Sequence, residues 1–194
     1  MRRCYRKMRL IKDRPKNVSG RAEKEVRVYD FLDQLNIPYE YVDHEPAQTM
    51  EDCAAVDQVL QTQMCKNLFL CNRQKTDFYL LLIRGEKKFK TKDISKQIGS
   101  ARLSFASAED MERLLDISPG AVSVLGLMND VQGQVRLLVD EDLLSEEFFG
   151  CHPCVNTSSL KVRTKDILET FLKAVDHEMT VVKIPQSQEQ GAES

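Results

Sequence analysis

Apolar residues recur along the chain at two spacings, which predict interleaved helices and strands. After Ser19, apolar side chains follow a helical period among charged residues as far as Asn36. The apolar runs 66–71 and 78–83 have the length of strands, and the polar segment 72–77 between them predicts an antiparallel hairpin. Further helices are expected over 49–60, 92–98, 107–115, 143–148 and 164–175, and further strands over 39–42, 101–105, 134–139, 159–162 and 179–184.

Three of these helices begin with residues that favour N-caps. Thr49, Ser107 and Thr164 each precede a helical stretch, and Asp110 follows Ser107 at the spacing of a capping box. Strands and helices alternate without forming a regular βαβ repeat, and the hairpin requires antiparallel pairing. We therefore expect an α/β fold, a single mixed-sheet domain with surrounding helices.

The length of 194 residues fits one domain, which we place at residues 21–184. Residues 1–20 form a basic arm that we expect to be disordered, and residues 185–194 form a polar tail that we expect to be disordered as well. Three other interpretations of the arm stay open: a nucleic-acid tether, a transit peptide, or translated sequence ahead of a start at Met8.

Composition narrows the functional class. Residues 1–21 hold nine basic residues and one acidic residue, whereas the rest of the chain has 19 basic and 29 acidic residues. An acidic body argues against indiscriminate coating of nucleic acid but leaves room for a local basic contact. No apolar run approaches the length of a membrane span, and no secretory signal is evident. We interpret the six cysteines as reduced thiols of a cytoplasmic protein.

Common catalytic motifs are absent from the sequence, including dinucleotide-binding, phosphate-binding, zinc-protease and nucleophile-elbow patterns. Cys151 and Cys154 have the spacing of a redox pair or half of a zinc site. The residues that follow them do not predict a helix, so we prefer two ordinary loop cysteines and keep a cysteine-based redox or zinc protein as an alternative.

Lys66 and Asn67 stand where a charged residue enters an apolar strand. A lysine at a strand end is commonly a solvated side chain. The functional alternative is a lysine that presents a fixed charge to a phosphate or to a developing oxyanion. The dipeptide alone does not decide between these two interpretations.

Four segments in a fixed order carry a resemblance to a known family. They are Lys66-Asn-Leu-Phe-Leu, then Gly99-Ser-Ala-Arg-Leu-Ser-Phe-Ala, then Ser118-Pro-Gly-Ala-Val-Ser-Val-Leu-Gly-Leu-Met-Asn-Asp, and finally His152-Pro-Cys-Val-Asn-Thr-Ser-Ser. The chain resembles the YbaK/ProX family of aminoacyl-tRNA editing domains, nearest to the freestanding prolyl-tRNA editing proteins. The resemblance extends from about Glu23 to Ile184.

This resemblance implies a hydrolase that deacylates mischarged aminoacyl-tRNA, with Ala-tRNA(Pro) as the expected substrate and without metal or organic cofactor. It implies partners at the acceptor end of tRNA(Pro), with prolyl-tRNA synthetase as a further candidate and no membrane. Lys66 and Asn67 take the catalytic positions. The substrate-binding positions fall on Gly120, Ala121, Val122, Ser123, His152 and Asn156. A catalytically silent relative that binds tRNA or a synthetase is the alternative.

Two further features of the sequence bear on this expected function. The segment 84–92 is rich in basic residues, and we expect it to contact the acceptor stem, with a solvated hairpin end as the alternative; its basic residues are Arg84, Lys87, Lys88, Lys90 and Lys92. Val124 stands where the family loop commonly has proline. Proline would stiffen that loop and remove a backbone donor, so the amino-acid preference of this chain can differ from that of its relatives.

Overall fold

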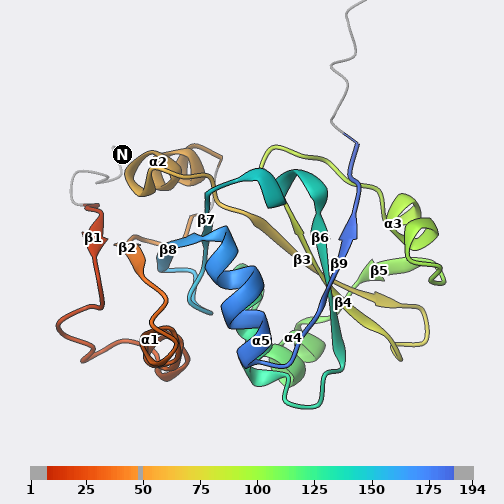
Figure 1. Ribbon diagram of the computed structural model, residues 1–194, viewed down its shortest axis with the longest axis horizontal. Helices are drawn as coiled ribbons and strands as arrows, with labels where there is room; N and C mark the ends of the chain where they lie inside the picture. Colours follow the sequence, from red (N-terminus) through yellow and green to blue (C-terminus); the bar gives the residue numbers. More distant parts are fainter. Residues whose placement is uncertain (1–7, 48–49, 186–194) are drawn as a thin grey trace, which may run out of the picture.

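Two β-sheets lie side by side and share one apolar core. The computed structural model describes residues 8–47 and 50–185. Figure 1 shows one sheet with α1 and α2 at one end of the molecule and the other sheet with α3 at the opposite end, with α4 and α5 between them. The strands are β1 (Ile11–Lys12), β2 (Tyr39–Asp43), β3 (Lys66–Asn72), β4 (Phe78–Ile83), β5 (Leu103–Phe105), β6 (Val135–Asp140), β7 (Phe148–Cys151), β8 (Ser158–Arg163) and β9 (Met179–Val182). The helices are α1 (Glu23–Gln34), α2 (Met50–Leu60), α3 (Thr91–Gln97), α4 (Ala108–Leu115) and α5 (Leu172–Ala174).

The larger sheet has the order β5-β3-β4-β6-β9 in the described part of the chain. Its centre is the expected hairpin, in which Lys66 pairs with Ile83 and Cys71 pairs with Phe78. Strand β5 runs antiparallel to β3, whereas β6 runs parallel to β4 and β9 parallel to β6. All six residues of β4 are buried, because apolar clusters cover both faces of the sheet. The expected mixed α/β architecture is confirmed.

The smaller sheet has the order β1-β2-β8-β7 and is antiparallel throughout. Strand β7 was not expected, since the sequence pattern predicted a helix over residues 143–148. That helix is a short 3-10 turn, Glu141–Ser145, after which the chain extends and pairs Phe149 with Val162 of β8. Pairing with β8, far along the chain, overrides the local helical pattern.

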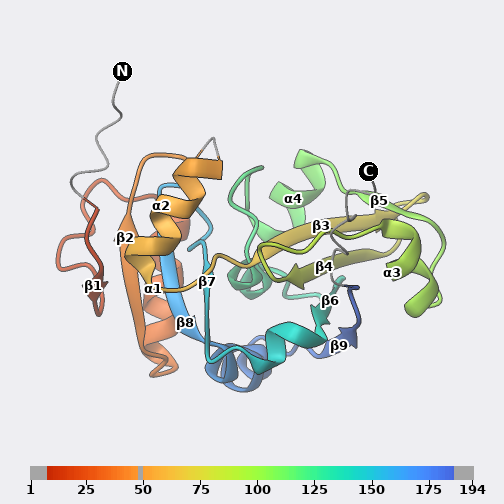
Figure 2. The ribbon, with the colours of Figure 1, turned by 90° about the horizontal axis from the view of Figure 1, so that it is seen from above.

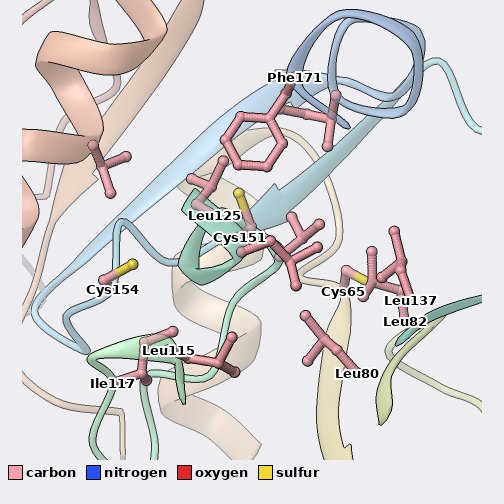
Figure 3. Close-up of a cluster of buried hydrophobic side chains, with 14 of the residues drawn as sticks. Cys65, Leu80, Leu82, Leu115, Ile117, Leu125, Leu137, Cys151, Cys154 and Phe171 are labelled. Carbon is pink, nitrogen blue, oxygen red and sulfur yellow. The ribbon is translucent and has the colours of Figure 1, made fainter. Parts of the chain in front are cut away.

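Buried side chains from both sheets meet in the shared core (Figure 3). Leu80, Leu82 and Leu137 come from the larger sheet, and Cys151 comes from the smaller one. Phe171 enters from a π-helical turn, Asp166–Phe171, that leads into α5. The expected helix over 164–175 is therefore present, but a wider turn replaces part of it.

The expected helix caps have different outcomes. Ser107 accepts a hydrogen bond from the Asp110 backbone N–H and completes a capping box at α4, as predicted. Thr164 does not cap its helix, because its buried hydroxyl has no hydrogen-bond partner among the described residues. Thr49 lies outside the described residues.

The described part of the basic arm is ordered, which corrects the expectation for residues 8–20. Ile11 and Lys12 form β1 and pair with Tyr41 and Glu40 of β2. Arg14 forms ion pairs with two acidic residues of α1, at 2.5 Å from Asp30 and 3.0 Å from Asp33. Residues 1–7, and residues 186–194 of the expected tail, lie outside the described residues. In the part that is described, no helix has the length and apolarity to cross a membrane.

Gly126 provides a test of how tightly the shared core is packed. A methyl group at this position would overlap with the Cδ1 atom of Ile117 and lie 3.2 Å from the Cβ atom of Leu115. We predict that Gly126→Ala lowers the free energy of unfolding by about 1–3 kcal/mol, measured by urea denaturation.

The matched control is Ile117→Val, which removes the overlapping Cδ1 atom. The double variant should be less destabilised than the sum of the two single variants. Strictly additive changes would contradict the packing described here.

Candidate active site

A cavity of about 340 Å³ lies where α2, the start of β3 and the ends of the smaller sheet come together. The chain crosses from α2 to β3 beside β7 and so joins the two sheets at this point (Figure 2). The polar side chains that line the cavity belong to His44, Asp57, Gln63, Lys66, Glu86, His152 and Ser159. The volume is in the range of small-molecule sites, so the cavity can take the end of a large substrate.

Lys66 is the first residue of β3 and is exposed on the cavity wall. Its position is fixed by the pairing of β3 with β4 and by one hydrogen bond, 3.0 Å long, from its Nζ atom to the backbone carbonyl of Lys87. An ammonium group has three donors and no acceptor. Lys66 can therefore keep this bond and still donate to a carboxylate, a phosphate or an oxyanion in the cavity.

Asn67 follows Lys66 but is not among the residues that line the cavity. Successive side chains of a strand point to opposite faces, which separates the two. The Asn67 Nδ2 atom donates to the backbone carbonyl of Cys65 at 3.0 Å, and its buried Oδ1 atom has no hydrogen-bond partner among the described residues.

Two histidines and a serine that also line the cavity form a hydrogen-bonded row. His44 Nδ1 lies 2.8 Å from the carbonyl of Glu45, and a carbonyl only accepts, so Nδ1 carries the proton. In the neutral ring His44 Nε2 then accepts from the hydroxyl of Ser159 at 2.9 Å. His152 Nδ1 donates to the carbonyl of Ser158 at 2.9 Å, with the Ser159 hydroxyl 3.4 Å away.

In this arrangement neutral His152 carries its lone pair on Nε2, which accepts no hydrogen bond from the residues that the structure describes. Burial lowers the pKa of His152, and the nearby His44 lowers it further, whereas the bond to the Ser158 carbonyl acts in the opposite direction. The net effect keeps the ring neutral at pH 7. A neutral imidazole nitrogen can accept a proton from water, which is the role of a general base.

The Gly120 loop does not line this cavity. Gly120, with φ +88°, is adjacent to Asn156, whose Nδ2 atom would be 3.6 Å from an added Cβ atom. Ala121 and Ser123 are buried, and the Ser123 hydroxyl accepts from the Leu125 backbone N–H at 3.2 Å, while Val122 is half-buried. The structure thus brings together Lys66 with His152, and separately Gly120 with Asn156. None of Gly120, Ala121, Val122, Ser123 and Asn156 is among the residues that line the cavity.

Sequence reasoning missed His44, Ser159 and Asp57. Strands β2 and β8 pair Val42 with Ser159, which brings the end of one strand beside the start of the other. Both strands were expected, but nothing in their local pattern indicates that they pair. Asp57 on α2 accepts from the Met64 backbone N–H at 2.9 Å, and burial raises its pKa.

The expected basic contact surface needs one correction. The side chain of Lys87 is only 3% exposed and its ammonium is paired with Asp140 and Asp142, so it cannot reach an RNA. Arg84 is half-buried and pairs with Glu86 and Glu146. The other three basic residues of the segment, Lys88, Lys90 and Lys92, are exposed.

Cys151 and Cys154 are both buried and carry free thiols. Burial raises the pKa of both thiols, that of Cys154 to about 12. Reactive and metal-binding cysteines act as thiolates, so this environment does not favour the redox or zinc alternative. Among residues 8–47 and 50–185, no group of three or more histidine, cysteine or acidic side chains is placed to hold a metal ion.

Comparison with known proteins identifies the class to which this fold and cavity belong. The model of the aminoacyl-tRNA editing domain matches residues 44–170, which is more than half of the chain. The chain therefore belongs to the aminoacyl-tRNA editing domain family, and the expected family is confirmed.

Particular relatives include a prolyl-tRNA editing protein, ProX, of Acetoanaerobium sticklandii, which is 32% identical over 74% of this chain and 87% of its own length. A prolyl-tRNA synthetase associated domain-containing protein 1 of Mus musculus is 30% identical over 84% of this chain and 95% of its own length. A crystal structure described as a proposed trans-editing enzyme for prolyl-tRNA synthetase shares the fold, with a TM-score of 0.64 at 17% identity, covering 84% of this chain and 99% of that one.

The row of histidines can be tested without any substrate. We predict that nitrogen-15 NMR finds neutral His152 with its proton on Nδ1, and that this ring titrates below the ordinary histidine pKa of about 6.5. Because folding favours the neutral ring, its contribution to stability is complete above that ordinary value and is lost as the pH falls below it.

Ser159→Ala is the matched control, because it removes the partner of His44 Nε2 but leaves the bond from His152 Nδ1 to the Ser158 carbonyl. The Nδ1 tautomer of His152 should persist in this variant. A His152 that titrates at or above the ordinary value, or that carries its proton on Nε2, would contradict the geometry.

Proposed function

We propose that this protein is a trans-editing hydrolase that deacylates mischarged aminoacyl-tRNA, with Ala-tRNA(Pro) as its substrate. The observation that carries the proposal is the cavity that both Lys66, at the start of β3, and His152, in the loop after β7, line. Membership of the editing-domain family supports the reaction class, and similarity to the bacterial prolyl-tRNA editing protein supports the choice of prolyl-tRNA.

The reaction needs a water molecule and a stabilised oxyanion. Water attacks the carbonyl carbon of the ester and gives up a proton to His152 Nε2, while the ammonium of Lys66 donates to the developing oxyanion. The ester bond then breaks, and the proton passes to the departing ribose oxygen. The products are free alanine and tRNA with its terminal hydroxyl restored. The reaction consumes one water molecule and needs no cofactor.

Substrate selection follows from the size of the site. A pocket built for proline in the synthetase cannot strongly reject the smaller alanine, which makes a second, smaller site necessary. We propose that Gly120, Ala121, Val122, Ser123 and Asn156 border the path of the aminoacyl end, because an added Cβ atom on Gly120 would lie 3.6 Å from Asn156, which is in the loop that carries His152. Asn67 supports this site by fixing the start of β3 through Cys65.

The rest of the tRNA has to lie outside a cavity of this volume. Gly85 and Glu86 line the cavity, and the exposed Lys88, Lys90 and Lys92 follow them along the chain. We propose that these three lysines contact acceptor-stem phosphates. Prolyl-tRNA synthetase is a candidate partner. The reaction would take place in the cytoplasm, where free thiols remain reduced.

The decisive experiment measures deacylation of tRNA(Pro) charged in turn with alanine, serine, cysteine and proline. We predict that Ala-tRNA(Pro) is hydrolysed fastest and that Pro-tRNA(Pro) resists. Lys66→Ala should lower kcat by at least about 100-fold, since it removes an oxyanion donor.

Lys75→Ala is the control, because Lys75 is an exposed lysine beyond the far end of β3; its kcat should equal that of the wild type. A protein that binds tRNA(Pro) but hydrolyses none of the four substrates would be the catalytically silent relative, and that result would overturn the proposal.

A further inference from the structure

Three charged side chains form a buried cluster outside the cavity. The Lys87 ammonium lies 2.6 Å from Asp140 and 2.7 Å from Asp142, and it also donates to the carbonyl of Ile184 at 2.9 Å. The side chain of Asp140 is completely buried and that of Lys87 is 3% exposed, while Asp142 at 30% is at the margin. The cluster therefore sits below the surface.

Stability alone does not explain such a cluster. Burying charges has a large desolvation cost, and replacing buried ion pairs by apolar residues is often neutral or even stabilising. What the cluster does provide is a fixed position for the residue at its centre. Lys87 is tied at once to the end of β6 through Asp140, to the turn that follows through Asp142, and to Ile184 after β9.

The backbone of Lys87 is the point at which this cluster meets the cavity. Its carbonyl accepts the hydrogen bond from Lys66 Nζ, and its N–H donates to the carbonyl of Arg84 at 3.1 Å, which closes a turn. Within that turn, a Cβ atom on Gly85 would lie only 2.7 Å from the carbonyl oxygen of Met64, a residue of the cavity wall. The turn is thus fixed by two contacts: Gly85 packs against Met64 of the cavity wall, and the Lys87 side chain is bound in the ion cluster.

Lys66 depends on such a fixed acceptor. It is exposed at a strand end, and a lysine side chain has a long flexible stem that would otherwise sample many rotamers. A hydrogen bond to a carbonyl that itself cannot shift restricts the ammonium to one region of the cavity. It does so without neutralising the charge, because the acceptor is a backbone carbonyl and not a carboxylate.

We propose that Lys87, Asp140 and Asp142 are positioning residues that act through the Lys87 carbonyl to hold Lys66 in its reactive location. This inference rests on the proposed function in so far as it treats Lys66 as catalytic. None of the three side chains lines the cavity, so any effect they have on the reaction passes through another residue.

The first test compares deacylation kinetics of Lys87→Met and Asp142→Asn with those of the wild type. Each should lower kcat by about 10- to 100-fold with little change in KM, since misplacement of a catalytic group acts on the chemical step. In a Lys66→Ala background neither substitution should lower kcat further. A further loss there would show that the cluster acts on the fold as a whole and would overturn the inference.

The control for stability is Asp110→Asn, which removes the ion pair with Lys75 and weakens the capping box of α4. It should lower the melting temperature and leave kcat unchanged. Lys87→Met leaves Asp140 without its charge partner; if that variant does not fold, Asp142→Asn, at the margin of the cluster, carries the test. Wild-type kcat in a folded Asp142→Asn or Lys87→Met protein would contradict the inference.

The second test needs no activity, which separates failure of this inference from failure of the proposed function. The rate at which an amine-acetylating reagent modifies Lys66, followed by peptide mass spectrometry, should rise about 2- to 10-fold in the same two variants, as expected for loss of one hydrogen bond. Lys88, which is exposed on the same segment, is the internal reference. An unchanged rate at Lys66 would overturn the inference even if the protein deacylates no tRNA.

Discussion

The packing of two sheets against one apolar core is the constraint on which the candidate site depends. Neither sheet contains the site by itself, because Lys66 begins a strand of the larger sheet, whereas Ser159 belongs to the smaller sheet and His152 directly follows its strand β7. Apolar residues of both sheets are completely buried between them. The distance between the ammonium and the imidazole is therefore set by core packing and not by any contact between the two side chains.

Local pattern was sufficient for the elements that are decided locally. The hairpin of β3 and β4 follows from two apolar runs and a polar turn, and the capping box at Ser107 follows from a spacing of three residues. Local pattern failed where distant pairing decides the outcome. Strand β7 forms because it pairs with β8, and Ile11 takes up a strand conformation because it pairs with Tyr41 of β2.

The same distinction applies to the site. Lys66 and His152 could be named from the sequence through their resemblance to family motifs, and the cavity contains both. His44 and Ser159 could not, because they meet only through the register of β2 with β8. The interpretation of Lys87 as an RNA contact was wrong for a related reason. The sequence shows that residue 87 is basic, but only the fold shows that its side chain is buried and paired with Asp140.

The hydrogen bond from Lys66 to a main-chain carbonyl has a consequence for how this site can vary. A side-chain acceptor disappears when its residue is replaced, whereas a carbonyl belongs to every amino acid. Sequence change at position 87 can therefore loosen the acceptor without deleting it. The geometry of the site can therefore weaken and recover gradually during evolution. No substitution at position 87 produces an intermediate protein that lacks the acceptor.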